Sequence, residues 1–224
     1  MGSILVEFEQ KCIDEGYFVK SPLKDIEASA CTIPITEVID FDKTKRLLVE
    51  DLNKALPIDE FKSCDCLKII PELSRCDFIE IKGVKEYIKR LKNDRRLDAN
   101  ITKQMKKFAL STKYIDSKTV LHLLVQLGKF EFAKKKKEHI KNIEPFLLIV
   151  TDIDTNKDRM LSFALALRKL RDDSENKEVR SKVIDGFLSN VDSLNNVNPK
   201  KKILIFEKDL DEYYENINKP HPNK

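Results

Sequence analysis

The sequence has no tryptophan and only five glycines among its 224 residues. So few glycines argue against a β-sandwich built on glycine-rich turns. The five are also too scattered to form the glycine-rich loops that bind nucleotide phosphates. The serine-hydrolase motif G-x-S-x-G is absent as well. The common nucleotide-binding and α/β-hydrolase signatures are therefore excluded.

Long apolar runs are also missing: none approaches the roughly 18–20 residues that a membrane-spanning helix needs. Glu7 and Glu9 interrupt the first apolar segment, which therefore does not resemble a secretory signal. The cysteines number five, and an odd count without a signal fits free thiols in a reducing environment. We expect an intracellular protein, in the cytoplasm or in the nucleoid or nucleus, without a membrane partner.

Three cysteines, Cys64, Cys66 and Cys76, lie close together in the sequence. Zinc ligands are usually separated by about two to four residues, whereas a single residue separates Cys64 from Cys66, and no fourth ligand is near. We therefore expect buried thiols on strands and no zinc site. His122 lies in the apolar segment VLHLLV, which favours a buried, hydrogen-bonded histidine over a catalytic base.

Charge is abundant but nearly balanced, since 36% of the residues are charged and the formal net charge is only +4. The lysine-rich runs lie at residues 85–96, 103–108, 133–142 and 198–202. Each run alone predicts a solvated helix face or a tail. Several such runs in the middle of the chain leave open a surface that faces phosphates.

The apolar patterns predict helices alternating with strands. Strands are expected within residues 63–70, 75–82, 144–154 and 201–210. Residues 31–41, which Pro34 interrupts, read as an extended segment or an edge strand. Helices are expected before Gly16, at 42–56, at 85–96, over 98–140 with divisions near Asp116 and Gly128, and in two segments between 158 and 191. This order predicts one helix-rich α/β domain over residues 1–217, with a mixed central sheet of about four to five strands and a flexible tail at 218–224.

The stretch SCDCLKIIPELSRCDFIEIKG, residues 63–83, reads as two strands around a turn. A four-residue loop at 71–74 would give pairs whose numbers sum to 145, with Asp65 opposite Glu80 and their Cβ atoms about 5 Å apart. Strand alternation puts Lys82 on the same face as Glu80. Two adjacent carboxylates would bind a divalent cation, and Lys82 could orient a water or stabilise charge on a phosphate. A register slip of one residue would turn Asp65 to the other face.

Asp65, followed after fourteen residues by Glu80-x-Lys82, resembles the motif of the PD-(D/E)xK (restriction-endonuclease-like) nuclease superfamily, although Cys64 stands where the family has proline. The resemblance implies a restriction-endonuclease-like fold that hydrolyses phosphodiester bonds of DNA, with RNA as a second option, by a Mg²⁺- or Mn²⁺-activated water. Asp65 and Glu80 would be metal ligands and Lys82 would assist the water. Glu50 on the preceding helix would be a further ligand, and Gln104 on the following helix a further catalytic residue.

Two other functions remain open from the sequence. Asp152 and Asp154 follow a strong strand and, together with Glu80, resemble the Toprim arrangement, which also uses Mg²⁺ on phosphodiesters. Alternatively, the chain is a non-catalytic nuclease fold or a helix-rich interaction module in a larger protein or nucleic-acid assembly. In that case the charges on the hairpin are ordinary salt bridges. A protein partner or a homodimer is left open in either case.

Overall fold

The structure, a computed structural model, describes residues 2–26, 31–53, 61–83, 87, 103, 107–127, 131–152, 177–197 and 201–218. Its centre is one sheet of six strands that follow each other in chain order. The strands are β1 (Lys20–Pro22), β2 (Glu37–Asp40), β3 (Cys66–Ile70), β4 (Arg75–Lys82), β5 (Phe146–Thr151) and β6 (Lys202–Phe206). The pairs from β1 to β4 are antiparallel, whereas β4–β5 and β5–β6 are parallel. The predicted α/β class with a mixed sheet is confirmed.

The strand count exceeds the prediction of four to five because β1 was missed. Three residues that end in Pro22 carry no alternating pattern, so β1 has no sequence signal of its own. Its pairing with β2 also corrects the expected edge strand: β2 lies between β1 and β3. The apolar run of β5 lies between β4 and β6, the kind of central position that a continuously apolar strand favours.

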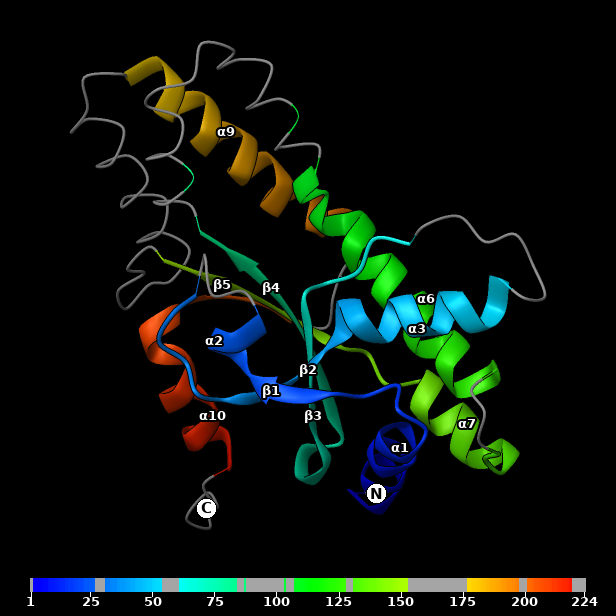
Figure 1. Cartoon of the computed structure of the whole chain (residues 1–224). Helices are drawn as coiled ribbons and strands as arrows, with labels where there is room; N and C mark the ends of the chain where they lie inside the picture. The colour runs from blue at the N-terminus through cyan, green and yellow to red at the C-terminus, as the bar shows by residue number, and fades with distance from the viewer. Residues whose placement is uncertain are drawn as a thin grey trace.

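Helices cover both faces of the sheet (Figure 1). They are α1 (Gly2–Asp14), α2 (Leu23–Ile26), α3 (Phe41–Asn53), α6 (Leu110–Leu127), α7 (Lys134–Lys141), α9 (Lys177–Ser193) and α10 (Leu210–Asn218). The larger core joins α1, α3, α6 and α9 to one face of the sheet, and the smaller core joins α2 and α10 to the other. Within the described ranges, no helix combines the length and apolarity that crossing a membrane requires.

Two helical predictions concern the long region from 98 to 140. The expected division near Asp116 is wrong, because α6 runs without a break from Leu110 to Leu127. The end near Gly128 agrees with the end of α6. The expected helix at 85–96 and the first of the two expected between 158 and 191 lie largely outside the described residues, as does the tail at 218–224 except for Asn218. The second of the two is confirmed, because α9 begins at Lys177 and ends at Ser193.

The β3–β4 hairpin has the predicted register. Leu67 faces Phe78 and Ile70 faces Arg75, so the numbers of each pair sum to 145. The loop is a 3-10 turn closed by Ser74, which adopts the left-handed conformation with φ of 49°. Asp65 directly precedes β3 and therefore lies across from Glu80.

Alternation along β4 separates two acids, Asp77 and Glu80, onto opposite faces of the sheet. Phe78 packs in the larger core, whereas Ile79 packs in the smaller one. Asp77 is fully buried on the side of Ile79, where the guanidinium of Arg75 donates to both of its carboxylate oxygens at 2.5 and 2.7 Å. Asp77 therefore belongs to a buried ion pair on the face away from Glu80.

All five cysteines are free and buried. Burial raises the pKa of the Cys31 and Cys76 thiols to about 12, so both are neutral near pH 7. These residues pack as small apolar side chains.

The start of α3 is tied to β2 and to the residue before β3. Asp40 Oδ1 accepts a hydrogen bond of 2.8 Å from the Lys43 amide, which makes Asp40 the helix cap. The Phe41 amide donates to the Asp65 carbonyl at 3.1 Å. The first turn of α3 therefore lies beside Asp65.

Asp40→Ala is expected to lower the free energy of unfolding by about 1 kcal/mol, because it removes the acceptor for a helix N-terminal amide. Asp40→Asn keeps an acceptor and should remain close to wild type. Urea denaturation of both variants measures the difference. Equal losses in the two variants would show that the cap is not what Asp40 contributes.

Candidate functional site

Asp65, Glu80 and Lys82 meet at the end of the hairpin, where α6 adds a second lysine. Lys113 Nζ lies 2.6 Å from Glu80 Oε1 and 3.4 Å from Asp65 Oδ1. Lys82 forms an ion pair with the same Glu80 oxygen. The structure therefore brings the three motif residues together and places two ammonium groups beside two carboxylates.

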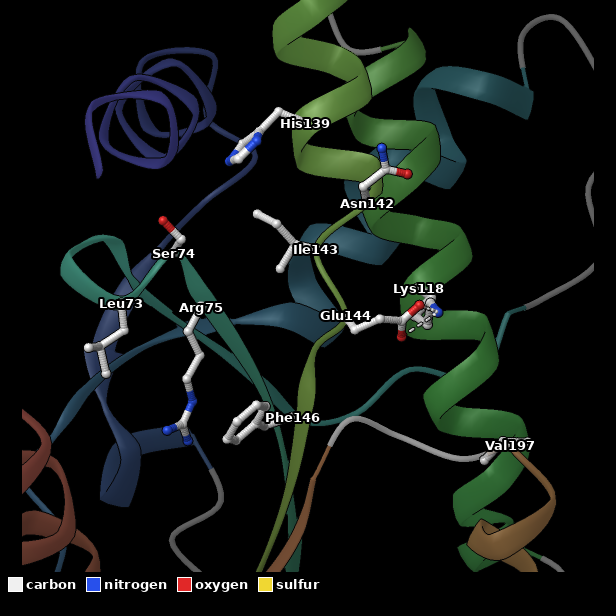
Figure 2. Close-up of a pocket in the computed structure, with 10 residues that line it drawn as sticks. All are labelled: Leu73, Ser74, Arg75, Lys118, His139, Asn142, Ile143, Glu144, Phe146 and Val197. Carbon is white, nitrogen blue, oxygen red and sulfur yellow. Dashed lines mark hydrogen bonds and ion pairs between the residues drawn. The ribbon is translucent and has the colours of Figure 1, made fainter. Parts of the chain in front are cut away.

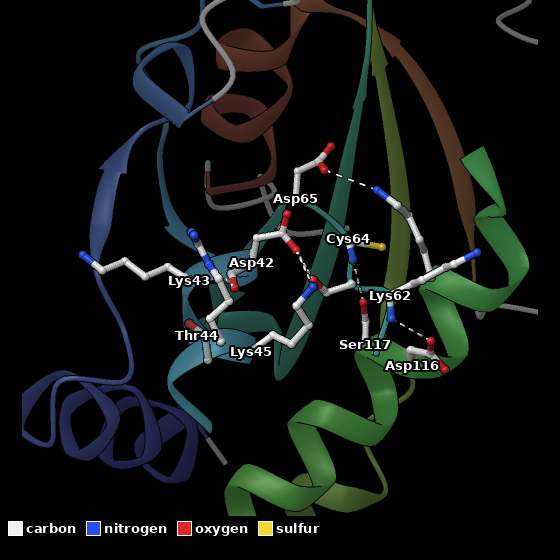
Figure 3. A network of polar contacts seen from close by, with 12 residues as sticks. Asp42, Lys43, Thr44, Lys45, Lys62, Cys64, Asp65, Asp116 and Ser117 are labelled. Carbon is white, nitrogen blue, oxygen red and sulfur yellow. Dashed lines mark hydrogen bonds and ion pairs between the residues drawn. The ribbon is translucent and has the colours of Figure 1, made fainter. Parts of the chain in front are cut away.

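Hydrogen bonds to β4 and to α6 fix the segment that contains Asp65, residues 62–65. The Ile81 amide donates to Asp65 Oδ2 at 2.7 Å. Two residues of α6 accept hydrogen bonds from the segment: Asp116 from the Lys62 amide and Ser117 from the Cys64 amide, both at 2.9 Å (Figure 3). The Asp65 carboxylate therefore has a fixed position, as a ligand or catalytic group requires.

Glu80 is fully buried, and its Oε2 has no hydrogen-bond partner within the described part of the chain. Burial and the charge of Asp65 raise the pKa of Glu80, while Lys82 and Lys113 partly offset that rise. Burial disfavours the ammonium form of Lys113, but Glu80 and Asp65 outweigh burial and hold its pKa above the usual value. Because an unpaired charge inside a protein is costly, the four groups depend on one another.

Lys82 is held from two directions. Its ammonium lies 4.9 Å from the centre of the Phe108 ring, and its side chain is only 11% exposed. A lysine packed in this way loses little further freedom when it donates a hydrogen bond. Lys82 is therefore suited to act on a group bound beside Glu80.

Glu50, the expected third metal ligand, is exposed on α3. It lies nine residues beyond Phe41, which corresponds to about 13 Å along the helix axis from the end that touches Asp65. The acid at that end is Asp42, which lies 3.2 Å from Lys45 and accepts a hydrogen bond from the Ser63 hydroxyl. Gln104 lies outside the described residues.

The Toprim-like set is divided between the faces of the sheet. Burial is the main cause that raises the pKa of Cys31, and the charges of Glu207, Asp211 and, last, Asp152 add to it. Asp152 therefore lies on the side of Cys31, which belongs to the smaller core. Glu80 points to the opposite face, with Phe78. Asp154 is not among the described residues. This placement does not bring Asp152 and Glu80 together.

His122 is half-buried, and its Nε2 lies 3.1 Å from the Lys141 carbonyl. Burial lowers its pKa, so the ring is neutral near pH 7. The predicted hydrogen bond is confirmed, whereas the predicted full burial is not.

The donor set at Asp65 and Glu80 suits a hard divalent cation, because both residues offer carboxylate oxygens and one of those oxygens lacks a partner. Among the described residues, no group of three or more His, Cys, Asp or Glu side chains is placed to hold a metal. Mg²⁺ is usually bound by one or two protein carboxylates and keeps several water ligands, so a site with two carboxylates is sufficient for it.

Comparison of the chain with protein-family models, curated proteins and solved structures finds no match. The chemistry of the site is therefore inferred from its own residues.

Proposed function

We propose that the protein hydrolyses phosphodiester bonds of nucleic acid, DNA in the first place, with a divalent metal ion held by Asp65 and Glu80. The observation that carries this proposal is that both carboxylates reach one cation, Lys113 Nζ, at 3.4 and 2.6 Å. Their two oxygens therefore lie no more than about 6 Å apart, the sum of these distances. Two carboxylates this close favour a shared positive ion.

Asp65 and Glu80 would hold Mg²⁺ or Mn²⁺ through their oxygens, and Glu80 Oε2 would gain the partner that it lacks. When bound, the ion would lower the pKa of a coordinated water and neutralise charge on the phosphate. The site needs no third protein acid for this role, since water and phosphate oxygens complete the coordination of Mg²⁺ in many phosphate-handling sites.

In the hydrolysis, the water oxygen forms a bond to phosphorus while the bond from phosphorus to the leaving oxygen breaks. One proton of the water passes to solvent, and the leaving oxygen takes up a proton. Lys82, held by Glu80 and Phe108, would donate a hydrogen bond to the attacking water. Lys113 would stabilise negative charge that grows on the phosphoryl oxygens.

The order of elements around the hairpin supports the finer assignment to a restriction-endonuclease-like fold. Helix α3 precedes the hairpin β3–β4, and α6 and α7 lead to β5, which is parallel to β4. Asp65 stands at the start of one hairpin strand, and Glu80 and Lys82 stand near the end of the other.

A second candidate is a non-catalytic module that binds nucleic acid or a protein partner. It is favoured by the position of Lys113, whose ammonium already neutralises the two carboxylates that would attract a metal. In that case Lys113 takes the place of the metal permanently. The quartet of charges, formed by Asp65, Glu80, Lys82 and Lys113, then only stabilises the fold.

Cleavage assays separate the two candidates. The protein is incubated with linear and circular DNA and with RNA, in Mg²⁺, in Mn²⁺ and in EDTA. We expect cleavage only with a divalent ion, and its loss in Asp65→Asn, which keeps an acceptor for the Ile81 amide but lacks the charge. Asp116→Asn is the matched control, because Asp116 accepts a hydrogen bond from the same segment, at the Lys62 amide, and belongs neither to the Asp65–Glu80 pair nor to its two lysines. Absence of cleavage for every substrate and metal, or equal cleavage by Asp65→Asn and wild type, would contradict the proposal.

A further inference from the structure

A cavity of about 460 Å³ lies between α3 and α6 and reaches Lys113, the lysine that contacts the two carboxylates. One acid, Asp42, lines it in the described part of the chain, together with five lysines: Lys45, Lys62, Lys103, Lys107 and Lys113. We call this cavity the lysine pocket. Lys113 belongs both to the pocket and to the Asp65–Glu80 pair. A group bound in the pocket would therefore lie next to the proposed active site.

The lysine pocket holds more positive charge than its own acid can balance. Asp42 lies beside Lys45 (Figure 3), with 3.2 Å between Oδ1 and Nζ. Asp42 also accepts a hydrogen bond from the Ser63 hydroxyl. Lys62, Lys103 and Lys107 have no carboxylate partner among the residues that the structure describes. Lysines gathered from separate elements repel one another, and a bound anion would relieve that repulsion.

A second cavity in the described part of the chain provides a contrast. It measures about 800 Å³ and lies at the opposite end of the sheet, beside the β3–β4 turn (Figure 2). Its cations are already neutralised: Lys118 lies 2.8 Å from Glu144, and Arg75 binds Asp77. Size therefore does not distinguish the lysine pocket, whereas unbalanced charge does.

We propose that the lysine pocket binds a phosphate monoester at the end of a nucleic-acid strand, so that the protein recognises strand ends. The nucleic-acid part of this inference rests on the proposed function, whereas the phosphate part rests on the pocket. A monoester carries about −1.5 to −2 charges at pH 7, compared with −1 for an internal diester. Several lysines in one cavity therefore favour the end over the backbone. The volume lies within the range of about 300–1,000 Å³ that is usual for small-molecule groups.

The test measures binding in EDTA, where no metal-dependent cleavage occurs. Fluorescence anisotropy compares one labelled oligonucleotide with a 5′-phosphate, with a 3′-phosphate and with hydroxyl groups at both ends. We expect one phosphorylated form to bind about tenfold more tightly than the hydroxyl form. Charge-assisted hydrogen bonds to the added phosphate are strong enough to lower the dissociation constant by at least that factor. The preference should vanish in Lys62→Gln/Lys107→Gln, which changes two exposed lysines of the pocket. It should persist in Lys134→Gln/Lys135→Gln, which removes the same charge from exposed positions of α7.

Equal binding of all three oligonucleotides, or a preference that survives in Lys62→Gln/Lys107→Gln, would overturn the inference. Competition by inorganic phosphate or adenosine monophosphate at the affinity of the oligonucleotide would overturn the assignment to strand ends. Cleavage without a binding preference for phosphorylated ends would leave the proposed function standing and contradict the proposal that the lysine pocket binds a terminal phosphate. End-dependent binding without cleavage in Mg²⁺ would support the pocket and contradict the nuclease.

Discussion

Replacing Glu80 with alanine is expected to lower the free energy of unfolding by about 3–5 kcal/mol, the usual cost of removing one partner from a buried ion pair. Glu80 is fully buried, and it is the shared counter-ion of Lys82 and Lys113. Without it, two largely buried ammonium groups would have Asp65 alone to balance them. Urea denaturation at neutral pH measures the loss.

The matched control is Glu144→Ala. Glu144 also forms an ion pair with a lysine, at 2.8 Å, but its side chain is 53% exposed. Exposed pairs contribute about 0–1 kcal/mol, so this variant should remain close to wild type. A Glu80→Ala variant no less stable than Glu144→Ala would mean that the quartet of charges does not hold this end of the hairpin.

Replacing Lys82 with alanine is expected to slow metal-dependent cleavage by about 10²–10³-fold, the range for losing a positioned proton donor or charge stabiliser. Lys82 is placed by Glu80 and by the Phe108 ring, so its ammonium is available where the water would be activated. Because Lys113 still pairs with Glu80, the variant should remain folded. Single-turnover rates at saturating metal and substrate measure the chemical step.

Lys68→Ala is the control for Lys82→Ala. Lys68 lies on the neighbouring strand β3, but its ammonium donates to the Glu37 carbonyl and lies 5.8 Å from the ring centre of Tyr214 in α10. It therefore faces away from Glu80, and its loss should leave the cleavage rate unchanged. If Lys82→Ala cleaved as fast as Lys68→Ala, Lys82 would have no role in the reaction.

The hairpin could be predicted from the sequence because its geometry is local. Period-two alternation places Phe78 and Glu80 on one face, and a four-residue loop then fixes which residues oppose each other. The same alternation turns Asp77 to the other face, where the structure pairs it with Arg75. Asp65 and Glu80 are thus brought together by features within twenty residues of each other.

Lys113 could not be predicted, since it is 33 residues from Glu80 and 48 from Asp65 in the sequence. Its position depends on how α6 packs against the sheet, where the Tyr114 ring meets Phe78 with centroids 6.0 Å apart. No local pattern encodes such a long-range contact. The run of lysines around residues 103–108 did signal local positive charge, but not that Lys103 and Lys107 would share a pocket with α3.

The central claim, that Asp65 and Glu80 hold a divalent ion, is tested most directly by thermal unfolding during a titration with Mg²⁺ or Mn²⁺ at constant ionic strength. We expect a saturable rise in the melting temperature of the wild-type protein, because an ion that binds the folded state alone stabilises it by about 2.7 kcal/mol at one hundred times its dissociation constant. The same titration of Asp65→Asn should give no such rise. A wild-type melting temperature that neither ion changes, or equal shifts in both proteins, would contradict the metal site.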